Sequence, residues 1–258
     1  MKEPRPRRQI EREFGVPFAG EIVEQAQWTQ TALKRLPHGG KLNWRELFGR
    51  EAPIVLDLGC GNGRYLIASA VWRPDHDHVG VDILPAVLRY ANRRGNQRGL
   101  KNLRFAAVDG RAFLDGLVPA GSVREIHIYH PQPFHDPREA GRRLIQPDFL
   151  ALVLRCLEPG GLLFLQTDNA AYWDYLQLVV PAFVEFTEQQ RPWPDSPKGR
   201  TRREIIALRR GMPIFRGWGK VRPIPAEEVA ALVARQPLPL FDAGPRNREL
   251  DQIEGAMQ

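Results

Sequence analysis

One stretch in the first quarter of the chain, residues 54–63 with the sequence IVLDLGCGNG, constrains the fold more than any other. It opens with an apolar run that contains Asp57, and glycines follow at alternate positions, 59, 61 and 63. An amphipathic run at residues 64–72 comes directly afterwards. This order is typical of a buried parallel strand, a tight turn and a helix, because glycine permits positive φ angles and lets a ligand approach the backbone closely. We therefore predict a strand–turn–helix unit with a ligand beside its turn.

A second apolar run, residues 79–83, also carries an acid near its end, Asp82. In sheets of this kind such an acid can hold the hydroxyl groups of a ribose. The glycine spacing is not that of a phosphate-binding loop, because no Lys follows it. The acid followed by three alternate glycines resembles instead the S-adenosylmethionine-dependent methyltransferases of Rossmann-like fold, where these residues surround the amino-acid end of the cofactor. The alternative is a glycine turn that binds nothing, and the matching positions of the two acids argue against it.

Strand-like and helix-like runs alternate along the rest of the chain. We predict strands at residues 54–58, 79–83, 103–108, 123–129, 162–166, 183–186 and 214–216, and helices at 64–71, 85–92, 111–117, 146–157, 171–180 and 201–210. Such alternation predicts an α/β fold with a mostly parallel, doubly wound sheet. We expect the last strand to be antiparallel.

Polar side chains follow five of the predicted strands. Ligands of doubly wound sheets bind beyond the carboxyl ends of the strands, so we expect these five to converge on one rim. The alternative is that the acids cap the helices that follow, which explains one or two of them but not all. The five residues are Asp57, Asp82, Asp109, Gln132 and Asp168.

The chain is expected to form one main domain with two appendages. We predict a basic N-terminal arm and a helix (19–36) within residues 1–45, a methyltransferase domain at 46–222, and a short helix (226–234) with a loose tail at 223–258. No long uncharged apolar run is present, which predicts no membrane span, and no apolar segment follows the basic start as in a secretory signal. Cys60 and Cys156 lack metal-site spacing and are interpreted as buried thiols in a reducing, cytoplasmic compartment.

Basic residues are concentrated in the C-terminal third of a chain whose formal net charge is +7. Residues 191–222 contain Trp193, Phe215 and Trp218 between the basic side chains, and only two acids, Asp195 and Glu204. This mixture suits a phosphate backbone with stacked bases. The alternative is a solvated basic face with the aromatic rings in the core. The basic residues are Arg191, Lys198, Arg200, Arg202, Arg203, Arg209, Arg210, Arg216, Lys220 and Arg222.

Further motifs resemble one family, the bacterial tRNA (guanine-N7-)-methyltransferases. They are RRLIQPDF at residues 142–149, PGG at 159–161, TD at 167–168, TRRE at 201–204 and RRG at 209–211. The resemblance implies a class I S-adenosylmethionine-dependent enzyme that acts on tRNA. It implies a cofactor site of Asp57, Gly59, Gly61, Asn62, Gly63, Asp82, Asp109 and Gln132, and a substrate site of Asp136, Asp168, Thr201 and Glu204.

One motif departs from the family pattern. The family carries P-D-P-W-x-K where this chain has PQPFHD at residues 131–136, so Gln132 takes the place of the proposed catalytic Asp and Asp136 that of the Lys. An active enzyme remains possible, because guanine N7 needs no deprotonation before it attacks a methyl group. The alternatives are a paralogue that methylates another base or an exocyclic amino group, since the loop also resembles an N/D-P-P-Y/F motif, and a catalytically silent RNA-binding homologue. A monomer and a homodimer both stay open.

Overall fold

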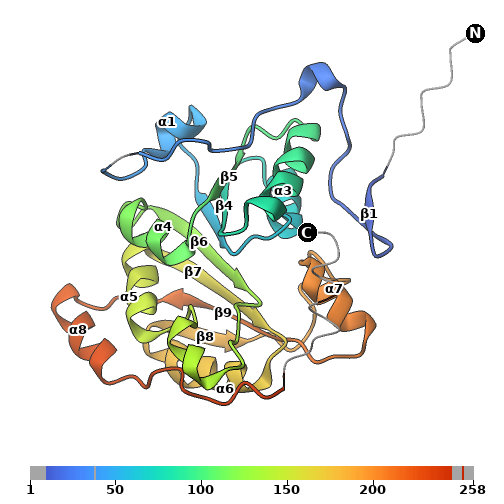
Figure 1. Cartoon of the computed structure of the whole chain (residues 1–258). Helices are drawn as coiled ribbons and strands as arrows, with labels where there is room; N and C mark the ends of the chain where they lie inside the picture. The colour runs from blue at the N-terminus through green and yellow to red at the C-terminus, as the bar shows by residue number, and fades with distance from the viewer. Residues whose placement is uncertain (1–9, 38, 246–251, 253–258) are drawn as a thin grey trace, which may run out of the picture.

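The computed structural model describes residues 10–37, 39–245 and 252, and its centre is a seven-stranded mixed sheet (Figure 1). The strand order is β5-β4-β3-β6-β7-β9-β8. All neighbours are parallel except β9, which runs antiparallel to both β7 and β8. The predicted mostly parallel sheet with an antiparallel last strand is confirmed. The strands are β3 (Ile54–Leu58), β4 (Asp77–Asp82), β5 (Leu103–Ala107), β6 (Val123–Tyr129), β7 (Leu157–Thr167), β8 (Val184–Glu188) and β9 (Phe215–Val221).

Helices pack on both faces of the sheet and form two apolar clusters. One cluster joins α2 (Arg64–Trp72) and α3 (Pro85–Gln97) to the face that bears Val55. The other joins α4 (Gly110–Gly116), α5 (Pro147–Cys156) and α6 (Ala170–Val179) to the face that bears Leu56. Successive side chains of a strand point to opposite faces, so a central parallel strand must be apolar on both. All of β3 is buried for this reason.

The predicted helix at residues 19–36 is wrong. Apart from a single 3₁₀ turn, Gln25–Gln27, this segment is extended, and Ala32 forms a parallel bridge with Phe105 at the outer edge of β5. Leu33 donates a backbone hydrogen bond to Phe105 O, and Phe105 donates one to Thr31 O, both 2.8 Å. The outer edge of a sheet has unpaired backbone N–H and C=O groups, and residues 31–33 supply partners for them. These hydrogen bonds outweigh the weak local helix propensity of the segment. The Thr31 hydroxyl lies 2.9 and 2.8 Å from the side-chain oxygens of Asn92 and Asn96.

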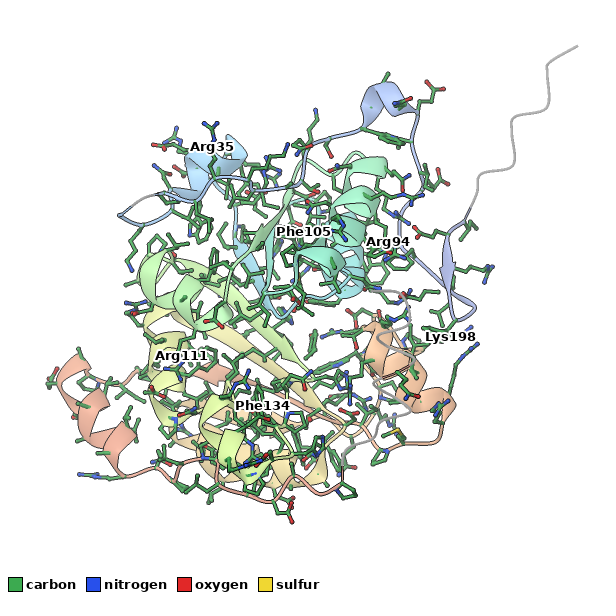
Figure 2. The ribbon with its side chains drawn as sticks, in the orientation of Figure 1. Arg35, Arg94, Phe105, Arg111, Phe134 and Lys198 are labelled. Carbon is green, nitrogen blue, oxygen red and sulfur yellow. The ribbon has the colours of Figure 1, made fainter. Side chains whose placement is uncertain are left out.

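The described part of the predicted N-terminal arm is folded. Residues 10–18 contain a small antiparallel hairpin of β1 (Arg12–Glu13) and β2 (Val16–Pro17), and residues 1–9 lie outside the described chain. Phe18, which follows the hairpin, is 4% exposed and lies beneath the guanidinium groups of Arg64 and Arg94 at 4.5 and 4.3 Å. Arg94 extends from α3 toward this hairpin (Figure 2). Cation–π contacts of this kind hold an otherwise short segment in place.

The C-terminal appendage is also more ordered than predicted. Helix α8 (Ala226–Ala234) forms where it was expected. The chain after it, predicted to be a loose tail, packs along α6 as far as Gly244, with the Phe241 ring 5.1 Å from Tyr172 and Asn169 Nδ2 donating to Ala243 O. Residues 246–251 and 253–258 lie outside the described part of the chain. Within the described residues, no helix has the length and apolarity needed to cross a bilayer.

Short helices complete the described architecture. α1 (Trp44–Phe48) begins at Asn43, whose side chain accepts a hydrogen bond from Glu46 N. α7 (Arg202–Arg209) begins at Thr201 in the same way, with Thr201 Oγ1 accepting from Glu204 N at 3.1 Å. This is the capping arrangement expected from the T-x-x-E spacing. It brings the start of α7 to the carboxyl end of the sheet.

Candidate active site

The glycine turn after β3 forms the floor of the candidate site. Gly59, Gly61 and Gly63 have φ angles of 80°, 52° and 74°, a region that side-chain-bearing residues rarely adopt. A Cβ atom at Gly59 or Gly61 would meet no atom within 4 Å, whereas one at Gly63 would lie 2.8 Å from the Phe105 ring. Gly63 is therefore required for packing, and the first two glycines keep the backbone open toward a space next to them.

That space is a cavity of about 580 Å³ beyond the carboxyl ends of β3, β4, β5 and β6. Its volume lies in the range of small-molecule sites. Most of the predicted cofactor residues and one predicted substrate residue line it, so four of the five strand-end polar groups converge as predicted, whereas Asp168 does not line the cavity. Those residues are Asp57, Gly59, Gly61, Asn62, Asp82, Asp109, Gln132 and Thr201.

Asp57 is a buried carboxyl group at the end of β3. It is 2% exposed, and its side chain receives no hydrogen bond from residues 10–37, 39–245 or 252. Burial and the neighbouring charge of Asp82 raise the pKa of Asp57 to about 8, while the charge of Arg200 acts in the opposite direction. A buried acid without a partner is costly, and it favours a positively charged ligand group in the cavity beside it.

The other two acids have different surroundings. Asp82 accepts backbone hydrogen bonds from Gly61 and Leu84, both at 2.9 Å, and so joins the end of β4 to the glycine turn. Asp109 accepts a hydrogen bond from Ala112 N at 2.9 Å and caps α4. The helix-cap explanation therefore holds for Asp109 but not for Asp57 or Asp82. All three still face the same cavity.

The loop after β6 brings Gln132 into the lining of the cavity. His130 and Phe134, at either end of the loop, have φ angles of 53° and 44°, and such conformations cost about 1–3 kcal/mol each in residues other than glycine. Gln132 is exposed, and its amide makes no hydrogen bond with the part of the chain that the structure describes. Arg142 lies 4.8 Å above the Phe134 ring. The loop thus presents a free amide and an aromatic ring to the cavity.

Asp168 supports this side of the site from behind. His130 Nδ1 lies 3.1 Å from its carboxylate, and Arg203 Nη2 donates to it at 2.9 Å. Burial would raise the pKa of Asp168, but the hydrogen bond from His130 and the charge of Arg203 outweigh it and hold that pKa well below its ordinary value. Asp168 is therefore ionised at neutral pH. His130 and Arg203, rather than Asp168 itself, line the cavity.

The remaining predicted residues do not line the cavity. Glu204 is fully buried, and its carboxylate accepts hydrogen bonds from Arg200 N at 2.7 Å and from Arg216 Nη2 at 2.9 Å. Asp136 accepts from Arg138 N and caps a 3₁₀ turn, Pro137–Arg142. Contact of either residue with a substrate stays a prediction.

A buried polar network beneath the cavity could not be located from the sequence. Arg200 donates to the Tyr129 hydroxyl at 2.6 Å, and its guanidinium lies 4.2 Å from the Trp193 ring. His127 contacts the hydroxyls of Tyr129 and Tyr65 at 2.8 and 3.0 Å. The one available indication was a His in the middle of a buried strand. Tyr65 and Tyr129 also line the cavity, so the network supports its lower surface.

The N-terminal hairpin adds another contact that was not predicted. Glu13 is 5% exposed and accepts hydrogen bonds from Asn62 Nδ2 at 2.8 Å and Arg202 Nη1 at 2.9 Å. It therefore connects the glycine turn to the first residue of α7. Glu13 and Arg202 are 189 positions apart in the sequence, so only the tertiary structure brings them together.

The basic residues of the segment 191–222 divide into three groups: buried, cavity-lining and exposed. Trp193 is buried, as the alternative interpretation expected of the aromatic rings, but Arg200 and Arg216 are buried as well, which neither interpretation predicted. Arg202 and Arg203 line the cavity, and Trp218 is 38% exposed. The basic residues that remain exposed are Arg191, Lys198, Arg209, Arg210, Lys220 and Arg222, and Lys198 lies at the outer edge of the loop before α7 (Figure 2).

A doubly wound sheet with an open glycine turn and strand-end acids defines a Rossmann-like methyltransferase. The family model described as "Putative methyltransferase" matches residues 51–216. The crystal structure of the 16S rRNA methyltransferase KamB has a similar fold, with a TM-score of 0.56 and 17% sequence identity over 75% of this chain and 99% of that one. At this identity the likeness concerns the fold alone.

Sequence relatives define the family more narrowly. The tRNA (guanine-N(7)-)-methyltransferase of Alcanivorax borkumensis is 34% identical over 190 residues, which are 74% of this chain and 79% of the relative. The enzyme of the same name from Halorhodospira halophila is 32% identical over 228 residues, 86% of this chain and 98% of the relative. The chain belongs to the tRNA (guanine-N(7)-)-methyltransferase family.

Proposed function

We propose that this protein transfers a methyl group from S-adenosylmethionine to N7 of a guanosine in tRNA. The observation that carries the proposal is a single cavity lined by an unpaired buried carboxyl, Asp57, by an open glycine turn and by the free amide of Gln132. Membership of the family supports the same substrate and reaction. The two cysteines are buried free thiols, which supports a cytoplasmic site of action.

The residues present fit this cofactor. Gly59 and Gly61 leave room for a ligand against the backbone, and Asp57 offers a carboxylate to its ammonium group once ionised. We assign the ribose hydroxyls and the base of the cofactor to Asp82 and Asp109, which line the same cavity. When bound, S-adenosylmethionine supplies an electrophilic methyl group on a positively charged sulfur. The chain's own contribution is to hold that group on the side of the cavity that faces Gln132.

The opposite side of the cavity suits a purine that needs no base catalyst. Guanine N7 carries a free lone pair, so positioning contributes most of the rate, and no side chain has to remove a proton first. Gln132 can donate or accept a hydrogen bond at the base edge, and Phe134 offers a ring for stacking. Gln132 cannot give negative charge to the cationic product ring, so we expect slower turnover than with a carboxylate at this position.

The exposed basic residues beyond the cavity suit the RNA backbone. Arg202 and Arg203 stand at the cavity, and the exposed basic residues named above, such as Arg209 and Lys198, lie on α7 and the loop before it. Phosphate contacts of this kind position a nucleic acid without reading its sequence. We therefore assign the α7 side of the molecule to the tRNA.

The decisive experiment is methyl transfer from labelled S-adenosylmethionine to unmodified tRNA, followed by mass spectrometry of the nucleosides. N7-methylguanosine is the expected product. A nucleoside methylated on an exocyclic amino group would identify the paralogue alternative instead. Binding of S-adenosylhomocysteine without methylation of any tRNA would overturn the proposal and favour a silent RNA-binding homologue.

A further inference from the structure

A buried arginine behind the active-site loop has no acidic partner. Arg143 is 1% exposed, and no carboxylate among the described residues forms an ion pair with it. Its guanidinium donates instead to main-chain carbonyls, at 2.6 Å to Pro133 O, 2.9 Å to Phe134 O and 2.8 Å to Phe241 O, and it also contacts Pro239 O. A buried cation needs such compensation. Arg143 therefore joins two segments that are about a hundred residues apart.

The second of these segments is residues 237–244, which we call the C-terminal strap. The Phe241 ring packs 5.1 Å from Tyr172 and 5.7 Å from Tyr175, with the Arg143 guanidinium 3.7 Å from its centre. Tyr175 Oη donates to Pro237 O at 3.1 Å, and Asn169 Nδ2 donates to Ala243 O at 2.9 Å. The strap is thus fixed at both ends and at its middle, along α6 (Figure 1).

The first segment is the loop at residues 130–135, whose front lines the cavity through Gln132 and Phe134. His130 and Phe134 have left-handed backbone conformations, which are strained in residues other than glycine. The loop therefore needs support from the rest of the protein to keep this conformation. Its rear is held by Arg143 and by His135, whose Nδ1 lies 2.8 Å from Gly244 O. Both residues also contact the strap, Arg143 at Pro239 and Phe241 and His135 at Gly244.

We propose that the C-terminal strap is a positioning element of the methyl-transfer site, with Arg143 as the positioning residue that transmits its hold to the loop. This inference rests on the proposed function. It assigns a role to a segment that lies beyond residues 51–216, the part of the chain matched by the family model. The strap touches the rear of the loop, so it sets where Gln132 and Phe134 stand without contacting a ligand.

Phe241→Ala tests the strap, because it removes the ring that seats it on Tyr172 and beneath Arg143. We expect amide hydrogen exchange in the loop to accelerate at His130, whose N–H donates to Gln166 O. We expect kcat for tRNA methylation to fall about tenfold or more, since small displacements of a reacting group carry large losses. The Kd for S-adenosylhomocysteine should change less than twofold, because the acids and glycines assigned to it lie on or directly after β3, β4 and β5 rather than in the loop. Leu240→Ala is the matched control, since Leu240 is the adjacent apolar residue and is 74% exposed.

Two further variants keep the inference open to refutation if Phe241→Ala folds poorly. Phe241→Leu retains apolar bulk and should restore most of the activity. Arg143→Lys keeps the charge, but one ammonium nitrogen with three donors cannot replace a planar guanidinium that reaches four carbonyls. Unchanged loop exchange in both Phe241→Ala and Arg143→Lys overturns the inference. So does a loss of cofactor affinity equal to the loss of kcat. A wild-type protein that methylates no tRNA refutes the proposed function alone, because loop exchange still reports on the strap.

Discussion

The buried carboxyl of Asp57 makes Asp57→Asn the most informative substitution in the molecule. Burial and the charge of Asp82 raise its pKa to about 8 from an ordinary value of 3.8, against the opposing charge of Arg200. An acid whose pKa rises on folding costs no stability below its unfolded pKa, and the cost grows as the pH rises toward the folded value. At pH 7 Asp57 stays protonated in the folded protein but is ionised in the unfolded chain. Between pH 3.8 and pH 7 this lowers the free energy of unfolding by about 1.4 kcal/mol per pH unit, or about 4 kcal/mol in total.

Asparagine has nearly the same shape and takes up no proton. We therefore expect the ligand-free variant to be more stable than the wild type at pH 7 by up to about 4 kcal/mol, and nearly equal to it close to pH 4. A change of 1 kcal/mol shifts the Tm of a domain of this size by about 2–4 °C, so the difference amounts to several degrees. Thermal unfolding between pH 4 and 8.5 measures it directly.

The same substitution should weaken binding of S-adenosylhomocysteine, because its ammonium group loses the ionised carboxylate. In the wild type, a cationic ligand favours ionised Asp57, so binding releases a proton and affinity rises as the pH increases toward 8. Calorimetry in buffers of different ionisation enthalpy detects this proton. Asp109→Asn is the control for stability, because asparagine caps a helix as well as aspartate does. Identical pH dependence of Tm in Asp57→Asn and wild type would refute the reasoning.

Three further substitutions test packing, two of them around the site and one at the outer edge of the sheet. Gly63→Ala should destabilise the fold by about 2–4 kcal/mol, since its Cβ would lie 2.8 Å from the Phe105 ring at a φ of 74°. Gly61→Ala is the control, because its new Cβ would meet nothing within 4 Å. Equal free energies of unfolding in urea for the two variants would contradict this prediction. Arg200→Lys should cost about 2 kcal/mol through the lost Tyr129 hydrogen bond and ring contact, and an unaltered Tm would speak against it. Thr31→Val should lower the free energy of unfolding in urea by about 1–2 kcal/mol, because it removes the hydroxyl contacts with Asn92 and Asn96. An unchanged free energy would show that the edge segment contributes nothing to stability.

Gln132→Asp with Asp136→Lys tests the departure from the family motif. A carboxylate at position 132 can stabilise the cationic product ring, so we expect the rate of tRNA methylation to rise, with Gln132→Asn as the uncharged control. Single-turnover assays isolate the chemical step. An unchanged rate would mean that the loop is adapted to a different substrate.

Local patterns in the sequence were sufficient to predict the sheet, most of the helices and the residues on the cofactor side of the site. The strand at Ile54–Leu58 was predicted to the residue, because a parallel strand buried on both faces is a mostly apolar run, here interrupted only by Asp57. The glycine spacing and the acids at the ends of β3 and β4 are equally local, since each follows from the turn that joins a strand to the next helix. Convergence in one cavity then follows from parallel topology alone.

Contacts between distant residues decided the rest. Residues 19–36 became an edge segment because Phe105 offered backbone partners, and the strap is ordered because Tyr172 and Arg143 receive Phe241. Which arginines of the basic segment are buried and which reach solvent depended in the same way on neighbours elsewhere in the chain. A residue's own sequence context determines its conformational preference, but burial and charge pairing depend on what the fold places beside it, and only the tertiary structure specifies that.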